Sequence, residues 1–294
     1  MFEILGMYAS YSLPFVLNKG ALSYVQPLFL ASSRMLIAGP LLLLYVYFFK
    51  RADFKFSPKH IPLLFTGIIA QSYLGYTLCF WAFQFLTANK NALLFSFTPF
   101  ITSIICYIFY GEKLTTKKII GLIIAFAGSL PLLMNHPGNE DAVGDLLFIS
   151  WPEIVCFLGV IGFAYGWIVF GALTKDYHYS PCMINGLSML IGGAMLLATS
   201  PFIDCWNPLP YTHLPIFLSY TIALVLISNF LAFNWYVSLL KKYSASTIAF
   251  FSFTEPLYVA VYSYLWLGEV ITWHFFVAFI AIFIGLYLFY QKEL

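Results

Sequence analysis

Ten apolar runs of about 20 residues follow one another through the chain, and short polar joints separate them. As a helix, a run of that length covers the roughly 30 Å hydrocarbon core of a membrane. Hydrophobic residues make up 62% of the chain and charged residues 9%. We therefore predict an all-α integral membrane protein with ten transmembrane helices at 3–22, 27–49, 61–84, 89–110, 116–135, 152–173, 181–203, 214–238, 244–267 and 272–290.

Several functional classes lack support in the sequence. A net charge of +2 gives nucleic acid no basic surface to bind, so we expect no nucleic-acid partner. The five cysteines have no paired spacing, and the five histidines fall at span ends, so no metal site is predicted. Neither a phosphate-binding glycine loop nor a hydrolase motif occurs. We expect a protein that is not an enzyme and that carries no cofactor.

The lysines predict how the chain is oriented in the membrane. Cytoplasmic loops of membrane proteins are rich in Lys and Arg. Threading ten spans places only Lys19 and Lys90 on one side, and eleven cations on the other, at positions 50, 51, 55, 59, 113, 117, 118, 175, 241, 242 and 292. We therefore expect both termini to be cytoplasmic.

The second half of the chain repeats the first. A shift of 157 residues places Pro99 on Pro256 and Gly128 on Gly285, and a shift of 154 places Pro27 on Pro181. Each half contains five spans, and because five is odd, the second copy must be inverted in the membrane. Inverted repeats with a site near the midplane are typical of secondary transporters.

Glu255 is the single charge within the run 244–267, and it falls near the middle of that run. A carboxylate at the centre of a membrane helix costs roughly 2.5–3.5 kcal/mol on insertion scales. Pro256 follows it, and Pro99 holds the equivalent place in the first half, so helix breaks are expected at both prolines. Because Pro256 has no amide hydrogen, we also expect the Ser252 carbonyl to lose its helical partner. Two interpretations remain: Glu255 binds a cationic centre or couples to a proton, or it is a structural carboxyl bonded to another helix.

Arg34 lies within the second span, about two turns from its outer end. Its planar guanidinium suits a substrate carboxylate, and it could equally pair with Glu255. Alternatively, it extends toward the lipid headgroups and anchors the helix.

Two segments carry a family resemblance. Phe97-Thr98-Pro99 with the run from Tyr110 to Thr115, and Thr254-Glu255-Pro256 with the run from Leu267 to Thr272, resemble the doubled EamA module of the drug/metabolite transporter superfamily. The resemblance implies one repeat at 1–135, an external connecting loop at 136–151 and a second repeat at 152–294. It also implies transport without ATP, and a central cavity lined mainly by the first, third, fourth, sixth, eighth and ninth spans.

Polar and aromatic side chains on these implied lining spans complete the predicted substrate site. Phe251 and Tyr258 share a helical face with Glu255, and Arg34 lies on the second span. The other candidates are Tyr11, Asn18, Tyr76, Trp81, Thr98, Trp167, Asn229 and Trp235.

We expect a secondary transporter of the bacterial inner membrane that carries a small polar metabolite, amino-acid or nucleoside-like. The chain is similar in size and aromatic richness to the S-adenosylmethionine exchangers of obligate intracellular bacteria, although no motif singles that branch out. S-adenosylmethionine, exchanged for S-adenosylhomocysteine, is therefore the named candidate substrate. One alternative is a proton-coupled exporter of amino acids or toxic compounds. Another is a structural or lipid-handling membrane protein.

Overall fold

A computed structural model describes residues 2–55, 57–82, 85–86, 94–113, 115–134, 150–207, 209–267 and 273–290. Every regular element within these residues is a helix, and an isolated bridge between Val25 and Tyr211 is the one strand-like pairing found there. The all-helical prediction is therefore confirmed. The predicted connecting loop at 136–151 lies almost entirely outside the described residues.

The helices follow the predicted apolar runs. The elements of the first half are α1 (Phe2–Ala21), α2 (Pro27–Phe49), α3 (Ile61–Gly67), η3 (Ile68–Gly75), α4 (Tyr76–Ala82), α6 (Thr98–Tyr110) and α7 (Thr116–Met134). Those of the second half are α9 (Trp151–Lys175), α10 (Pro181–Ile203), α11 (Leu214–Leu224), η4 (Val225–Ala232), α12 (Phe233–Leu239), α13 (Ala245–Phe250), η5 (Phe251–Thr254), α14 (Glu255–Leu267) and α15 (Trp273–Tyr290).

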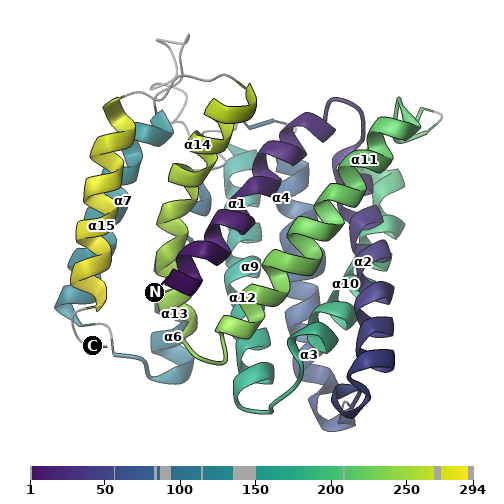
Figure 1. The fold of residues 1–294 in the computed structure, drawn as a ribbon, viewed down its shortest axis with the longest axis horizontal. Coiled ribbons are helices and arrows are strands. Elements are labelled where there is room, and N and C mark those ends of the chain that lie inside the picture. The colour runs from purple at the N-terminus through teal and green to yellow at the C-terminus, as the bar shows by residue number, and fades with distance from the viewer. Residues whose placement is uncertain are drawn as a thin grey trace.

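Five of the described helical stretches are long and apolar enough to cross a membrane. They are Pro27–Phe49, Pro58–Ala82, Trp151–Lys175, Pro181–Ile203 and Leu214–Leu239. Both α2 and α10 begin with proline, which fits the first turn of a helix because its missing N–H would have no helical partner there. α1 begins and α15 ends at the same end of the molecule (Figure 1).

The two halves share unusual local geometry. η3 and η4 are both π-helical segments of 8 residues, and they begin 157 residues apart in the chain. α6 and α14 also begin 157 residues apart, each with proline as its second residue. π-helical segments interrupt the regular hydrogen-bond ladder and occur frequently at functional sites. The irregular backbone therefore occurs at matching places in the two halves.

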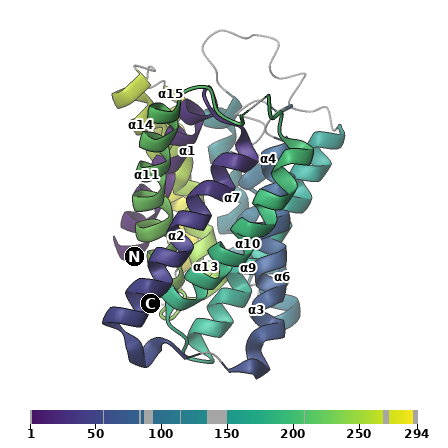
Figure 2. The same cartoon turned by 90° about the vertical axis from the view of Figure 1, so that its right-hand side faces the viewer.

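Matching helices of the two halves lie side by side. α2 packs along α10 at one end of the molecule, and α7 packs along α15 at the other (Figures 1 and 2). Gly39 of α2 approaches Leu190 and Gly193 of α10 approaches Met35, so residue numbers rise along one helix as they fall along the other. These two contacts together require α2 and α10 to be antiparallel.

Gly39 shows how tightly α2 and α10 approach each other. A Cβ atom added at Gly39 would lie 2.7 Å from the backbone nitrogen of Leu190 and 3.0 Å from the carbonyl oxygen of Gly186. Backbone atoms cannot move aside as a side chain can. We expect Gly39→Ala to cost about 1–3 kcal/mol of stability, the usual cost of overpacking. The measurement is the fraction of detergent-solubilised protein that stays monodisperse after heating.

Gly171→Ala is the matched control for this prediction. A Cβ atom at Gly171 would meet only the Leu240 side chain, at an ordinary distance of 3.4 Å. That variant should melt within about a degree or two of the unmodified protein, since the added methyl group makes an ordinary contact with a flexible side chain and meets no backbone atom at close range. Equal melting of the two variants would mean that the α2–α10 crossing tolerates a methyl group.

Candidate substrate site

Glu255 lies at a break in the run 244–267. α13 ends at Phe250, the four residues of η5 form a 3-10 turn, and α14 begins at Glu255 itself. A helix break is therefore present at Pro256, and the Ser252 carbonyl, which the proline deprives of its α-helical partner, still has a hydrogen bond. It accepts a hydrogen bond from the Glu255 N–H, because the chain tightens into 3-10 geometry before the proline. The negative side chain thus lies at a helix N-terminus, where the helix dipole favours negative charge.

The Glu255 side chain is deep within the protein but not packed solid. Protein atoms surround it, yet it keeps part of its surface accessible. Its carboxylate lies close enough to Tyr8, Tyr11 and Tyr236 for its charge to act on their hydroxyl groups. Within the described residues, no hydrogen bond or ion pair satisfies this carboxylate. Glu255 therefore lies inside the bundle without a polar partner among the described residues.

Arg34 is buried inside the bundle, with 3% of its surface exposed. Its Nη1 donates to Asn18 Oδ1 at 3.5 Å, its Nη2 donates to the Tyr76 hydroxyl at 3.3 Å, and its guanidinium lies 5.5 Å from the Tyr76 ring centre. Its Nε, also buried, has no hydrogen-bond partner among the described residues. The side chain does not extend toward the headgroups, so that alternative from the sequence is not supported.

Arg34 and Glu255 are not an ion pair in this structure. Both groups instead lie close enough to the Tyr11 hydroxyl for their charges to act on it. A buried charge without a counter-charge is costly. Arg34 and Glu255 are therefore two groups of opposite charge type inside the bundle that do not pair with each other.

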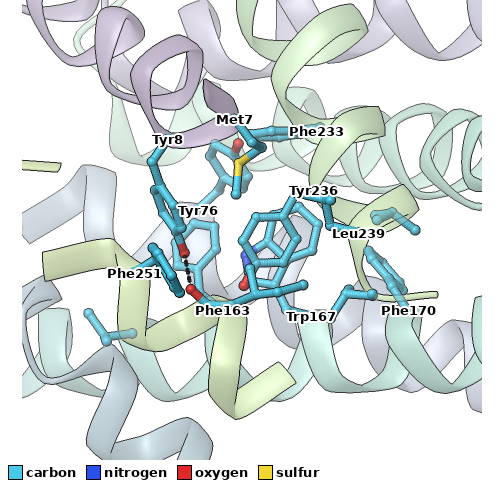
Figure 3. Close-up of a cluster of buried hydrophobic side chains, with 14 of the residues drawn as sticks. Met7, Tyr8, Tyr76, Phe163, Trp167, Phe170, Phe233, Tyr236, Leu239 and Phe251 are labelled. Carbon is cyan, nitrogen blue, oxygen red and sulfur yellow. Dashed lines mark hydrogen bonds between the residues drawn. The ribbon is translucent and has the colours of Figure 1, made fainter. Parts of the chain in front are cut away.

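Aromatic rings from both halves of the chain form a buried cluster, which includes Tyr76, Phe233 and Tyr236 (Figure 3). The Tyr11 ring lies 5.7 Å from that of Phe233 and 6.0 Å from that of Tyr236. Tyr236 stacks on Trp167 with ring centres 4.3 Å apart, and Tyr76 meets Phe163 edge-on at 5.1 Å. Ring faces of this kind attract planar bases and cations.

The other predicted site residues differ in how they are placed. Asn18 and Tyr76 both bond the Arg34 guanidinium. Tyr258, Trp81 and Trp235 are half-buried, and the Trp235 indole lies against Gly6. Thr98 also keeps accessible surface and donates to the Phe95 carbonyl at 2.6 Å.

Two predicted residues are fully enclosed in this conformation. Phe251 has no exposed surface and belongs to the hydrophobic core. Asn229 is equally buried, within η4, and its Nδ2 lies 3.6 Å from the Met189 sulfur while its Oδ1 has no partner among the described residues. Either residue would need a rearrangement to contact a ligand.

Sequence reasoning missed Tyr236, Phe233 and Phe163, which come together with the predicted residues only in three dimensions. Apolar periodicity treats them as ordinary membrane aromatics. One available signal was the spacing of three between Phe233 and Tyr236, which places both on one helical face. Metal binding has no basis in the part of the chain that the structure covers, since no three His, Cys, Asp or Glu side chains gather there.

Comparisons with known proteins show which family the chain is similar to. The model of the EamA-like transporter family matches residues 1–134 and 150–291. A protein of Chlamydia muridarum named S-adenosylmethionine/S-adenosylhomocysteine transporter is 31% identical over 261 residues, which is 88% of this chain and 81% of that protein. A protein of the same name from Chlamydia trachomatis serovar L2 is 29% identical, over 88% of this chain and 79% of its own length.

More distant similarities extend to other bacteria and to a solved structure. An uncharacterized transporter of Bacillus subtilis, YvbV, is 26% identical over 87% of this chain and 80% of its own length. One crystal structure superposes with a TM-score of 0.76 over 98% of this chain and 93% of that chain. At 14% sequence identity, that superposition shows a shared fold and nothing further.

Proposed function

The chain belongs to the EamA-like transporter family, and from that premise we propose that it exchanges S-adenosylmethionine for S-adenosylhomocysteine by alternating access. The resemblance to the drug/metabolite transporter superfamily is confirmed, as is the expectation of a transporter and not an enzyme. The protein is a multi-pass protein of the bacterial inner membrane, and its relatives carry small molecules.

The proposed architecture is two inverted repeats of five helices each, ten in all, with both termini in the cytoplasm. Antiparallel contact between α2 and α10, and between α7 and α15, supports this arrangement. So does the recurrence of the π-helical segments 157 residues apart. Rocking of one half against the other would then expose a central site to each side of the membrane in turn.

The observation that carries the substrate proposal is the pair of buried, opposite, unpaired charges among aromatic rings. We assign Arg34 to the substrate carboxylate, which a guanidinium can bind with two parallel hydrogen bonds. Glu255 would complement the positive centre of the substrate, the ammonium or the sulfonium group. The rings of Tyr11, Phe233 and Tyr236 would offer faces to the adenine. S-adenosylmethionine has all of these groups in one molecule.

A proton-coupled exporter of amino acids or toxic compounds is the second candidate, because Glu255 is a carboxyl group inside the bundle, without an ion-pair partner among the described residues, that could carry a proton. An intramembrane structural or lipid-handling protein is the third. The three candidates differ in what drives solute movement across a sealed membrane, so one vesicle experiment separates them.

Counterflow in proteoliposomes tests the proposal. Vesicles loaded with unlabelled S-adenosylhomocysteine should accumulate external labelled S-adenosylmethionine, whereas empty vesicles should not, with or without a pH gradient. Accumulation in empty vesicles that follows a pH gradient would favour proton coupling instead. A purified, monodisperse protein that moves neither S-adenosylmethionine nor any amino acid in a panel would contradict transport of this substrate class.

A further inference from the structure

α1 begins and α12 ends at one end of the protein, which we call the lysine-rich end. We propose that this end is closed in this conformation by a two-layer gate between α1 and the second half of the chain. The inner layer is a cluster of three buried rings, Tyr8, Trp167 and Tyr236. The outer layer is the ion pair of Glu3 and Lys242. The proposal rests on the proposed function, because a gate has a purpose only if the site opens to both sides in turn.

The inner layer borders the site on the side of the lysine-rich end, and Tyr236 belongs to both. Tyr236 stacks on Trp167 at 4.3 Å and meets Tyr8 edge-on at 6.4 Å, so the three rings form one continuous contact (Figure 3). None of the three is more than 5% exposed. α1 begins and α12 ends at the lysine-rich end. One turn farther from that end, Tyr11 follows Tyr8 on α1 and Phe233 precedes Tyr236 on α12. A ligand bound at Tyr11 would have to pass these rings to leave at that end.

A buried hydrogen bond holds the inner layer shut. The Tyr8 hydroxyl donates to the main-chain carbonyl of Ile248 at 2.9 Å, and it joins α1 to α13 across 240 residues of sequence. Ile248 and its neighbours Ala249 and Phe250 are all at most 1% exposed. α1 cannot move away from α13 without breaking this bond and exposing apolar surface.

The outer layer lies at the surface. Lys242 Nζ lies 2.9 and 3.1 Å from the two carboxylate oxygens of Glu3. This ion pair connects the loop after α12 to the first turn of α1. Hydrogen bonding to Glu3 raises the pKa of the Lys242 ammonium. The Lys242 ammonium therefore keeps its charge at neutral pH, and its contribution to the pair is lost as the pH rises through that elevated pKa. Because both side chains are more than half exposed, salt should weaken the pair.

The Tyr236–Trp167 stack lies within the second half of the chain. The Tyr8–Tyr236 contact, the Tyr8–Ile248 hydrogen bond and the Glu3–Lys242 ion pair join α1, in the first half, to elements of the second half. Relative rocking of the two halves must break them together, whereas contacts within one half would survive it. The buried ring cluster and the Tyr8 hydrogen bond are expected to stabilise the closed state more than the ion pair does, because exposed ion pairs contribute little to stability.

Thiol accessibility tests the gate without any need for transport. Phe233→Cys places a reporter one turn beyond Tyr236, in a background where the exposed Cys205 and half-buried Cys182 are replaced by serine. Inverted and right-side-out vesicles are treated with a membrane-impermeant maleimide, and the labelling rate from the lysine-rich side is recorded. The same background without the reporter corrects for the three buried native cysteines, Cys79, Cys106 and Cys156.

Tyr8→Phe removes only the hydroxyl that bonds Ile248. Losing one net hydrogen bond should raise the open population, and with it the labelling rate, about 2- to 10-fold. Tyr165→Phe is the matched control, since it removes a hydroxyl that contacts Thr66 at 3.5 Å outside the gate, and it should leave the rate unchanged. A Tyr8→Phe rate equal to that of the unmodified reporter overturns the inner layer.

Charge reversal tests the outer layer and stays informative if Tyr8→Phe misfolds. Glu3→Lys and Lys242→Glu should each raise labelling at low salt, and combining them should restore the original rate because the pair re-forms with its signs exchanged. Rates that do not change in either single variant overturn the outer layer. Because labelling is scored without substrate, these results fail or succeed separately from the counterflow experiment that tests the proposed function.

Discussion

Glu255→Gln should reduce counterflow of S-adenosylmethionine at least about 30-fold while the protein still inserts and remains monodisperse. The substitution keeps the shape of the side chain and removes its charge. Removing one partner of a desolvated charge pair costs about 2–5 kcal/mol, which corresponds to that loss or more. The folded protein should tolerate the change because no described residue depends on the carboxylate for a hydrogen bond or ion pair. The measurement is the initial rate in proteoliposomes at matched protein content.

Glu153→Gln is the control for that result, because Glu153 is also a buried glutamate in a membrane helix. Its carboxylate accepts the Ser150 N–H at 2.8 Å and caps α9, a role that a glutamine side chain can also fill. Transport in Glu153→Gln should stay within about twofold of the unmodified protein, the range of ordinary benign substitutions. Full activity of Glu255→Gln would remove Glu255 from the site, whatever the control does.

Arg34→Lys should raise the concentration of S-adenosylmethionine that half-saturates transport about 10-fold or more, equivalent to 1.4 kcal/mol of lost binding. Lysine keeps the positive charge but loses the planar fork that holds Asn18 and Tyr76 and that would grip a carboxylate. Arg34→Gln, which removes the charge as well, should have the larger effect. Both effects should appear in the substrate concentration dependence, measured over a range of external concentrations.

Arg51→Lys is the matched control, since Arg51 and Arg34 are the two arginines of the chain. Arg51 is exposed, follows the end of α2 and lies 5.4 Å from the centre of the Tyr47 ring, which is not a predicted site residue. Its replacement should leave half-saturation unchanged. If Arg34→Lys behaved as Arg51→Lys does, the guanidinium would have no part in binding the substrate.

The sequence was sufficient to predict the helical class and many helix ends. The apolar runs 27–49 and 181–203 coincide with α2 and α10 at both ends, because proline starts each helix and charge follows each one. The lone charge of 244–267 also located the break at Glu255, because a buried carboxylate beside a proline is rare without a functional reason. These features depend on local composition, which a single sequence displays directly.

The surroundings of the site could not be predicted in the same way. Whether Arg34 pairs with Glu255 or stands apart depends on how α2 and α14 are placed, and no local pattern encodes that distance. The π-helical geometry of η3 and η4 is likewise invisible in hydropathy, although it recurs at matching places. The ring cluster of Tyr8, Trp167 and Tyr236 combines three helices that are far apart in the sequence.

Competition binding with edited ligands tests the central claim most directly. The purified protein binds labelled S-adenosylmethionine, which is displaced by unlabelled S-adenosylmethionine or by its carboxamide, in which the carboxylate is neutral. The account predicts that the carboxamide competes at least about 10-fold more weakly in the unmodified protein, and that this difference disappears in Arg34→Gln. An undiminished preference for the carboxylate in Arg34→Gln would show that another group binds it and would contradict the account.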